Sequence, residues 1–288
     1  MFGGYAVRAE QVTDPVAYHG EGPVWSERWG GLRWLDMLAG DVLSLTDDGE
    51  VKRRHVASVV AAIRPRTQGG TVIGIERGFA LEDDDGTLRD LGELWTDDQV
   101  RMNEGGCDPD GRFYCGSMSK NKRPGAGTLY RLDVDLSVHV VLANVTISNG
   151  LEWSPDGSRA YYNDTPTCSV SIFDYDSQAG LTNRRVFVDL SSESKRPDGL
   201  TVDEQGGVWV ALSNGSAVRR YTSDGVLDEV VEVSAKKVTA CTFGGPKLDQ
   251  LFITTSRQNI EPGTDPLAGS LFRVIPGVRG FPVREFAG

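Results

Sequence analysis

Three oxygen-bearing residues, spaced widely along the chain, each stand at the start of a short and mostly apolar run. Glu21 precedes Gly-Pro-Val-Trp, Asn149 precedes Gly-Leu-Glu-Trp, and Asp198 precedes Gly-Leu-Thr-Val. Two carboxylates and an amide carbonyl, brought together, would supply two negative charges and hard oxygen donors. Such donors suit Ca²⁺, Mg²⁺ or Mn²⁺ better than a metal that prefers thiolates, although carboxylates also bind Zn²⁺. We therefore predict a site for one divalent cation, with Ca²⁺ as the first candidate.

A simpler interpretation is that these residues only begin strands or form turns, since Asp-Gly and Asn-Gly are common turn dipeptides. For any one of them alone, this alternative is the stronger. Asp198-Gly199 does not fit it, because Gln205-Gly206-Gly207 already provides the hairpin turn of that segment. Carboxylates that face each other inside a protein are also costly unless a cation compensates their charge. Taken together, the three residues favour a metal site.

Other kinds of catalytic site find little support in the sequence. It contains no Gly-x-Ser-x-Gly, His-Glu-x-x-His or Gly-x-x-x-x-Gly-Lys-Ser/Thr motif. With 3 histidines in 288 residues, a histidine-rich metal site is nearly excluded. His19, close to Glu21, is expected at the rim of the site or in support of a ligand. The 4 cysteines show no Cys-x-x-Cys spacing and are expected to be free thiols.

A repeated pattern of short strands is expected to position these residues. Strand-like runs separated by glycine-containing turns recur with a period of roughly 40 to 50 residues, which is typical of β-propeller blades. We predict an all-β, six-bladed propeller with four-stranded antiparallel blades, forming a single domain over residues 1–288. The last segment lacks a fourth strand, and the N-terminal run from Ala6 to Gln11 is expected to supply it and close the ring.

In a propeller, the first strand of every blade lies beside the central channel, so equivalent positions of the repeats form one ring. These positions carry, in chain order, Glu21, Val59, Asn103, Asn149, Asp198 and Thr239. We expect these residues to converge at one end of the channel. The tryptophans at strand positions are expected in the core, whereas Trp95, in the loop before Arg101, is a candidate wall of the pocket.

Six stretches in order along nearly the whole chain add a more specific signal: residues 19–25 (HGEGPVW), 101–103 (RMN), 147–153 (ISNGLEW), 196–200 (RPDGL), 241–245 (CTFGG) and 269–272 (GSLF). Together they resemble the regucalcin/gluconolactonase (senescence marker protein) family. The resemblance implies a six-bladed, metal-dependent propeller that hydrolyses sugar-acid lactones, so the expected partner is a small sugar lactone. Residue by residue, it implies metal ligands at Glu21, Asn149 and Asp198, and substrate-binding groups at Arg101 and Asn103.

The chain departs from the family pattern in two places. Glu104 stands where family members often carry Asp, which affects the local hydrogen bonding. Residues 119–123 (SKNKR) form a short basic segment where regucalcin-like members have a longer lid with an acidic substrate contact. This segment is either a solvated loop or a lid that attracts acidic sugars.

The reaction implied by the resemblance is the opening of a lactone by water, with the cation polarising the carbonyl and activating the water. Asp198 is the candidate general base, and a role as a ligand only is left open. Arg101 would hold hydroxyls or a developing carboxylate through its planar donors, or else pair with Asp97 or Asp98. The alternative functions are a metal-dependent esterase or phosphotriesterase of the same fold and a non-catalytic metal-binding propeller.

The overall composition limits the partners. The net charge is -11 and the isoelectric point is about 4.8, which argues against nucleic acid or an anionic membrane as a partner. No apolar run has the length of a signal peptide or a membrane span. We therefore expect a cytoplasmic protein that is a monomer or a weak homo-oligomer.

Overall fold

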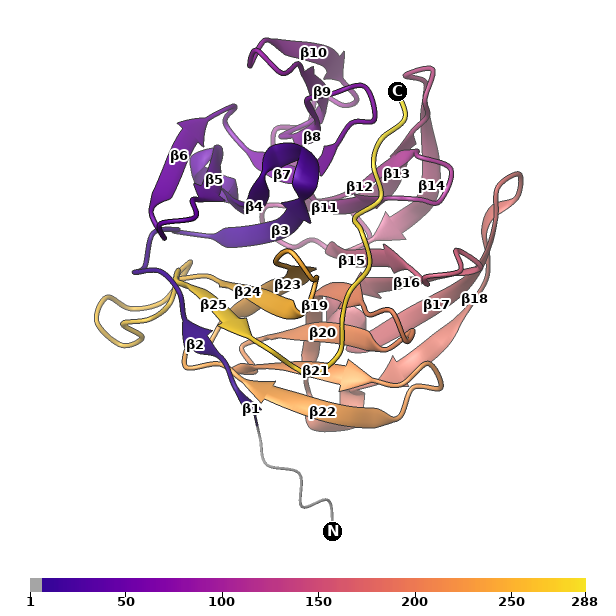
Figure 1. Ribbon diagram of the computed structural model, residues 1–288. Helices are drawn as coiled ribbons and strands as arrows, with labels where there is room; N and C mark the ends of the chain where they lie inside the picture. The colour runs from indigo at the N-terminus through magenta and orange to yellow at the C-terminus, as the bar shows by residue number, and fades with distance from the viewer. Residues whose placement is uncertain (1–6) are drawn as a thin grey trace.

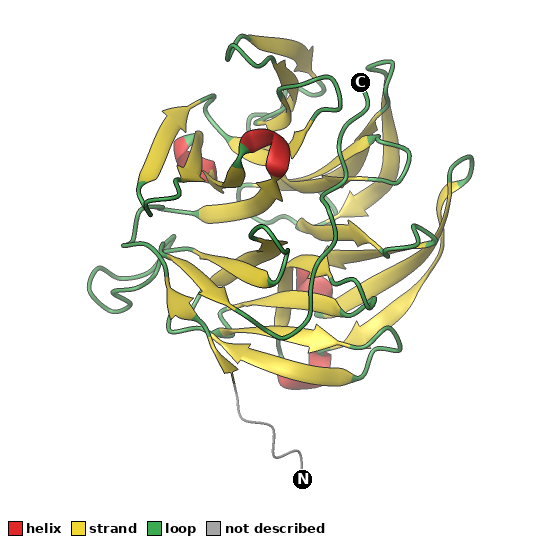
Figure 2. Cartoon of the chain, in the orientation of Figure 1, coloured by secondary structure: helices red, strands yellow, loops and turns green. Residues whose placement is uncertain are grey.

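The computed structural model describes residues 7–288, which form six small β-sheets arranged around a central axis (Figures 1 and 2). Within each sheet, strands that follow one another in the chain pair antiparallel. The protein is thus a six-bladed β-propeller, as the repeat period predicted. The prediction of a single domain over 1–288 includes residues 1–6, which lie outside the described range.

The first three sheets contain four strands each. The first sheet consists of β3 (Gly20–Ser26), β4 (Gly31–Asp36), β5 (Asp41–Leu45) and β6 (Val51–His55). The second consists of β7 (Val60–Pro65), β8 (Thr71–Ile75), β9 (Gly78–Glu82) and β10 (Leu88–Glu93). The third consists of β11 (Val100–Cys107), β12 (Phe113–Ser119), β13 (Gly127–Leu132) and β14 (Val138–Val145).

The other three sheets include the two strands nearest the N-terminus. The fourth sheet consists of β15 (Ser148–Trp153), β16 (Arg159–Asp164), β17 (Ser169–Asp176) and β18 (Gly180–Asp189). The fifth consists of β19 (Arg196–Val202), β20 (Val208–Ser213), β21 (Ala217–Tyr221), β22 (Leu227–Glu232) and β1 (Val7–Arg8). The sixth consists of β23 (Val238–Gly244), β24 (Gln250–Thr255), β25 (Leu271–Val274) and β2 (Glu10–Gln11).

The helices are all short. Each is a single 3₁₀ turn of three residues: η1 (Glu27–Trp29), η2 (Met37–Ala39), η3 (Thr165–Thr167) and η4 (Ser191–Glu193). Glycine-rich turns at short intervals leave no room for longer helices in residues 7–288, which agrees with the all-β prediction. None of the helices in residues 7–288 has the length and hydropathy needed to cross a membrane.

The N-terminal segment closes the ring, in part as predicted. Strand β2 pairs antiparallel with β25, which places Glu10 opposite Arg273 and completes the sixth sheet. The Arg273 guanidinium and the Glu10 carboxylate also form an ion pair at 2.5 Å. Strand β1 behaves differently, because it pairs in parallel with β22 and extends the fifth sheet. Ala6, the first residue of the predicted closing strand, lies outside the described residues.

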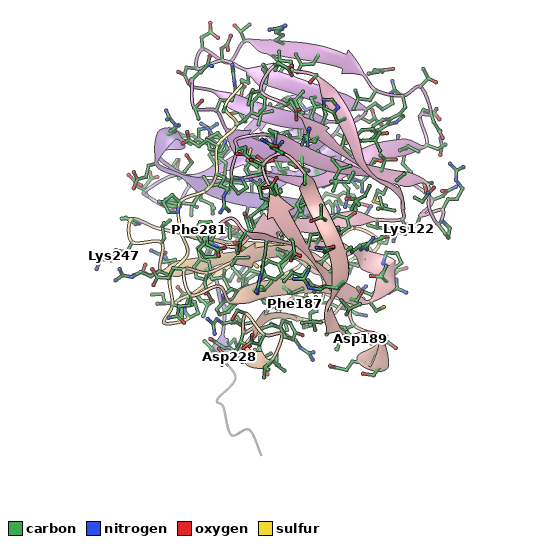
Figure 3. The ribbon with its side chains drawn as sticks, turned by 90° about the vertical axis from the view of Figure 1, so that its right-hand side faces the viewer. Lys122, Phe187, Asp189, Asp228, Lys247 and Phe281 are labelled. Carbon is green, nitrogen blue, oxygen red and sulfur yellow. The ribbon has the colours of Figure 1, made fainter. Side chains whose placement is uncertain are left out.

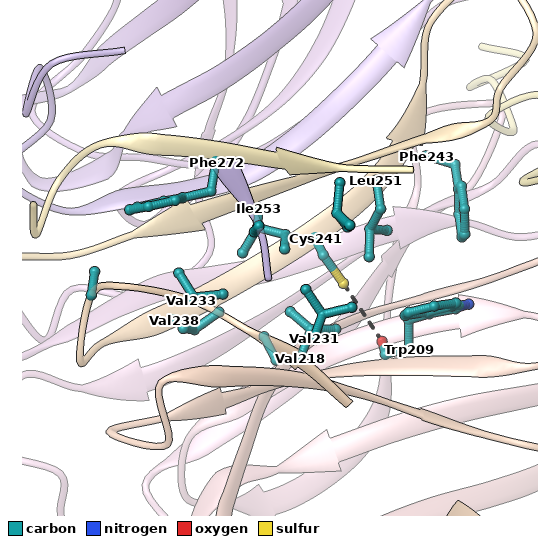
Figure 4. Close-up of a cluster of buried hydrophobic side chains, with 14 residues drawn as sticks. Trp209, Val218, Val231, Val233, Val238, Cys241, Phe243, Leu251, Ile253 and Phe272 are labelled. Carbon is teal, nitrogen blue, oxygen red and sulfur yellow. Dashed lines mark hydrogen bonds between the residues drawn. The ribbon is translucent and has the colours of Figure 1, made fainter. Parts of the chain in front are cut away.

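Apolar side chains fill the space between neighbouring sheets. Figure 4 shows the cluster between the fifth and sixth sheets, where the rings of Trp209 and Phe243 meet edge to face with centroids 5.8 Å apart. Trp34, Trp153 and Trp209 are fully buried, which confirms the prediction that they belong to the core. Trp25 is half-buried and stacks on Phe252. All four cysteines are free, as predicted.

The C-terminal segment, after β25, crosses the end of the ring where the inner strands finish (Figure 1). The backbone N–H of Phe286 donates to the Pro65 carbonyl at 2.9 Å, and that of Ala287 donates to the Gly111 carbonyl at 2.9 Å. The Phe286 side chain is fully buried against the core of the second and third sheets. This segment therefore covers one end of the channel, and the other end remains for a ligand.

Candidate active site

A cavity of about 510 Å³ lies at the end of the ring where the inner strands begin. It is lined by all six residues that were predicted at equivalent positions in the first strands of the blades: Glu21, Val59, Asn103, Asn149, Asp198 and Thr239. Arg101 also lines it. The prediction that these residues converge at one end of the channel is therefore confirmed.

A β-bulge interrupts every inner strand at the level of this cavity. The register shifts fall between Glu21 and Val24, Val60 and Ala62, Met102 and Glu104, Asn149 and Leu151, Pro197 and Leu200, and Val238 and Ala240. A bulge bends its strand and takes a side chain out of the regular alternation between the two faces of the sheet. Six bulges at one level therefore account for the ring of polar side chains around the axis.

Glycines at two of these bulges allow the inner strands to approach closely. A Cβ atom on Gly150 would lie 2.7 Å from the Asp198 carbonyl oxygen, and one on Gly199 would lie 2.5 Å from the Cβ of Ala240. Both distances are too short for real side chains. Glycine follows Asn149 and Asp198 because of packing near the axis, so the alternative that these dipeptides form turns is wrong.

The Asn149 amide joins two of the predicted metal ligands. Its Nδ2 donates to Oδ1 of Asp198 at 2.5 Å and to Oγ1 of Thr165 at 3.0 Å. The Thr165 hydroxyl donates to the Pro197 carbonyl at 2.9 Å, which fixes the position of the donor set. Because Nδ2 is used in this way, the carbonyl oxygen of Asn149 is left facing away from these partners.

Both carboxylate residues are buried: Glu21 is 4% exposed and Asp198 is 7% exposed. Burial raises the pKa of the Asp198 carboxyl from 3.8 to about 7. Burial also raises the pKa of Glu21 well above its ordinary value, and the charges of Asp198 and Glu104 raise it further. Removing water from an anion disfavours its charged form, so both carboxylates are held at a free-energy cost. A bound cation would remove this cost.

Two oxygens of this set are buried without any hydrogen-bond partner: Oε2 of Glu21 and Oδ1 of Asn149. Buried polar atoms usually have partners, so such orphan acceptors need an explanation. Two carboxylates and one amide oxygen match the donors of a hard divalent cation, and the residues present therefore fit the predicted ion. Among residues 7–288, no group of three or more His, Cys, Asp and Glu side chains is placed to hold a metal. The amide is thus an essential member of the candidate set.

Arg101 is a buried cation beside these acids, with 6% exposure. Its Nη1 donates to Oδ1 of Asn103 and to the Met102 carbonyl, both at 2.8 Å. Nδ2 of Asn103 donates in turn to the Ser148 carbonyl at 2.8 Å. The alternative pairing of Arg101 with Asp97 or Asp98 is wrong, because its guanidinium faces the cavity. Burial lowers the pKa of Arg101 to about 10, so it stays charged at neutral pH.

Sequence reasoning gave only partial indications for two further polar groups. His19 lies between Ser256, whose Oγ is 2.7 Å from Nδ1, and Glu21, whose Oε1 is 3.5 Å from Nε2. Burial lowers the pKa of His19 to about 3, so the ring is neutral and helps to orient Glu21. Glu104 accepts from the Gly150 N–H at 2.7 Å, and burial raises its pKa to about 8. Its position next to Asn103 in the chain carried no sign of this hydrogen bond.

The basic segment 119–123 contributes two side chains to the cavity, Lys120 and Lys122. Lys120 also forms an ion pair with Glu76, with 2.7 Å between Nζ and Oε1. Trp95 does not wall the pocket as proposed. It stacks on Tyr130 within the core between the second and third sheets, and its Nε1 donates to the Val100 carbonyl at 3.2 Å.

Comparison with known proteins agrees with this architecture. Residues 19–257 match the family model described as "SMP-30/Gluconolactonase/LRE-like region". Regucalcin of Oryctolagus cuniculus is 33% identical over 297 residues, covering 98% of this chain and 99% of the relative. The Bacillus subtilis (strain 168) protein named "Putative sugar lactone lactonase YvrE" is 34% identical, covering 96% of this chain and 97% of the relative.

A solved structure matches over nearly the full length. The calcium-binding protein regucalcin from Agrobacterium tumefaciens str. C58 superimposes with a TM-score of 0.92 at 26% sequence identity. The match covers 99% of this chain and 100% of that chain.

Proposed function

Since the chain belongs to the SMP-30/gluconolactonase family, we propose that it is a metal-dependent hydrolase that opens sugar-acid lactones. One observation carries the proposal: the orphan oxygens of Glu21 and Asn149 lie beside the Asp198 carboxylate in a cavity that also holds the Arg101 guanidinium. Buried carboxylates together with acceptor oxygens that lack hydrogen-bond partners support a cation site. A cationic side chain in the same cavity supports a substrate on which negative charge develops.

In this proposal Glu21, Asn149 and Asp198 hold one divalent cation, with Ca²⁺ as the first candidate and Zn²⁺, Mg²⁺ or Mn²⁺ as alternatives. The calcium binding stated for the Agrobacterium regucalcin supports Ca²⁺. When bound, the cation would supply Lewis-acid polarisation of the lactone carbonyl and would lower the pKa of a nearby water. The carboxylates, whose pKa values burial raises, must lose their protons before they bind it.

Asp198 is the proposed general base. Its Oδ1 accepts the hydrogen bond from Asn149, which leaves Oδ2 to take a proton from the attacking water. The water oxygen bonds to the carbonyl carbon, the ring C–O bond breaks, and the proton passes to the leaving alkoxide. The product is one open-chain hydroxy acid, so atoms and charge balance without any further reactant. A pKa near neutrality suits a group that accepts and then returns a proton.

Arg101 is the proposed substrate-binding group, with Asn103 beside it. Asn103 accepts from Nη1 of Arg101 and thereby holds the planar guanidinium in one orientation. Among the described residues, Nη2 of Arg101 has no hydrogen-bond partner, so it is free to donate to substrate hydroxyls or to the developing carboxylate. The second hydrogen on Nδ2 of Asn103 is available for a weaker contact.

The test is turnover of glucono-, xylono- and galactonolactone by the purified protein, with and without chelator. We expect turnover that chelator abolishes and that added Ca²⁺ or another divalent cation restores. Asp198→Ala should lose it, whereas Asp189→Ala, a change at an exposed residue on the outer strand β18, should keep it. Tight metal binding without lactone or ester hydrolysis would replace the proposal with a non-catalytic metal-binding propeller. Hydrolysis of aryl esters or phosphotriesters alone would identify the other enzyme class.

The remaining expectations about partners and location stay predictions. They comprise a small sugar lactone as the partner, no nucleic-acid or membrane partner, a monomer or weak homo-oligomer, and a cytoplasmic location.

A further inference from the structure

The charge lining the cavity is opposite in sign to the charge of the whole chain. The chain has 30 basic and 41 acidic residues, yet more cationic than acidic side chains line the cavity. The cationic side chains are Arg101, Lys120, Lys122, Arg196 and Lys237. The acidic ones are Glu21, Glu76 and Asp198. An excess of positive charge at the mouth of one cavity attracts anions from an otherwise acidic surface.

The acids of the cavity do not neutralise the cations at its mouth. Glu76 is paired with Lys120, and in the proposed function Glu21 and Asp198 are compensated by the divalent cation. Among the described residues, no carboxylate oxygen lies within ion-pair distance of Lys122, Arg196 or Lys237, and Lys120 is the one lysine of residues 7–288 that forms an ion pair.

Two of these cations come from opposite parts of the ring and line the same cavity. Lys122 lies in the connection between β12 and β13, and Lys237 directly precedes β23. The pKa of Lys237 is lowered by burial and then by the charges of Lys122 and Lys236. Like charges held near each other are unfavourable unless an anion lies between them.

The backbone holds Lys122 at the mouth of the cavity. Its N–H donates to the Ser119 carbonyl at 2.8 Å, and the next residue, Arg123, donates its N–H to Oγ of Ser119 at 2.6 Å. On the other side, Nζ of Lys237 donates to the Gln258 carbonyl, a neutral group that leaves the charge uncompensated. The Lys122 backbone and the Lys237 ammonium are thus held beside the cavity, whose volume of about 510 Å³ is typical of sites that enclose small molecules.

We propose that the substrate of this site is a lactone that carries a second, anionic group, a carboxylate or a phosphate, which binds between Lys122 and Lys237. The inference rests on the proposed lactonase function, because it places the lactone ring at Glu21, Asn149 and Asp198. The anionic group then lies at the mouth, where the two ammonium groups donate to its oxygens. The basic segment 119–123 is accordingly a lid that recognises acidic sugars.

Matched pairs of lactones test this inference. D-glucaro-1,4-lactone differs from D-glucono-1,4-lactone only by a carboxylate at C6, and 6-phosphoglucono-1,5-lactone differs from glucono-1,5-lactone only by a phosphate. We expect kcat/KM at low ionic strength to be at least about tenfold higher for the anionic member of one pair, and the larger ratio identifies the anion. Each ammonium contributes a few-fold at a partly exposed site, so the two together give this order of magnitude. The ratio should fall as salt is added.

The double substitution Lys122→Gln and Lys237→Gln should bring the ratio close to one. Lys247→Gln is the matched control, because Lys247 is an exposed lysine on the side of the molecule opposite Lys122 (Figure 3), and it should leave the ratio as it is. A thermal melt of the double variant checks that it is folded. A ratio near one in the unmodified protein, or a ratio that the double substitution leaves unchanged, overturns the inference while the lactonase function stands.

A binding measurement separates this inference from the proposed function. If neither member of a pair is hydrolysed, calorimetry of D-glucarate and D-gluconate against the Ca²⁺-loaded protein still examines the anion site. Tighter binding of D-glucarate that the double substitution removes would support the site, although the lactonase function would have failed. Equal binding of D-glucarate and D-gluconate would overturn the anion site as well as the lactonase function.

Discussion

Replacing Asp198 with Asn should stabilise the metal-free protein at alkaline pH while removing its metal site. The change keeps the size of the side chain, and the new amide oxygen still accepts from Nδ2 of Asn149. What it removes is a buried negative charge whose nearby hydrogen-bond donors, without a cation, are the neutral side chains of Ser213 and Asn149. A residue kept for its function at a cost in stability should show this behaviour.

The size of the effect follows from the pKa of Asp198. Burial raises this pKa from 3.8 to about 7, and that difference corresponds to about 4 kcal/mol against the ionised folded state. Because the folded pKa is the higher one, the cost is absent below pH 3.8, grows as the pH rises, and is complete above pH 7. Asp198→Asn should therefore gain up to about 4 kcal/mol at pH 8 and less than half of that at pH 5.

Denaturant unfolding in the presence of chelator, at pH 5 and at pH 8, measures this gain. The control is Asp189→Asn on the outer edge of the fourth sheet, where the carboxylate accepts from the Ser191 N–H and its pKa is lowered. That variant should be no more stable than the unmodified protein at pH 8. With saturating Ca²⁺ the order of stability should reverse, since only the unmodified protein gains binding free energy.

An Asp198→Asn variant that is equally or less stable than the unmodified protein at pH 8 in chelator would refute this reasoning. It would mean that the carboxylate is already compensated by groups of the protein itself. A gain that is as large at pH 5 as at pH 8 would also refute it, because the charge would then not be its cause.

Three further predictions concern other parts of the site and the fold. Ca²⁺ affinity should rise about tenfold or more per pH unit below pH 7, and binding should release protons, because Asp198 and Glu21 must ionise. Calorimetry in buffers of different ionisation enthalpy measures the affinity and the number of protons released. Arg101→Lys should lower kcat/KM for the best lactone by about 10- to 100-fold, since a point charge replaces the oriented fork, while Ca²⁺ affinity measured by calorimetry changes little. Phe286→Ala should cost about 3–5 kcal/mol in denaturant unfolding, because its fully buried ring anchors the C-terminal segment, and a loss below about 1 kcal/mol would contradict that role.

The ring of residues at the starts of the inner strands could be predicted, because equivalent positions of a repeated sequence occupy equivalent places in the fold. Once the period is recognised, Glu21, Asn149 and Asp198 occupy the same position in three blades, and a closed ring brings equivalent positions to one axis. Local signals added to this, since the turn of the fifth blade at residues 205–207 left Asp198 without a role in a turn. The inner strands could be found because they are apolar and end in glycine-rich turns.

The features that sequence reasoning missed depend on contacts between distant segments. The outer strand β18 (Gly180–Asp189) is mostly exposed and rich in polar residues, so it lacks the hydrophobic alternation that reveals a strand. The parallel pairing of β1 with β22 has no signal in either segment. The six bulges, and the hydrogen bond from the Gly150 N–H to Glu104, arise only when neighbouring blades pack together. Pairing partners and buried charges of this kind follow from tertiary structure.

The most direct test of the proposed cation site is the anomalous diffraction of crystals of the protein soaked in Mn²⁺. We predict one strong peak at the end of the channel where the inner strands begin. It should lie about 2.0–2.6 Å from carboxylate oxygens of Glu21 and Asp198 and from the amide oxygen of Asn149. The same soak of Asp198→Asn crystals should lose the peak. A peak bound by other residues, or no peak in crystals of a protein that hydrolyses lactones in chelator, would contradict the account.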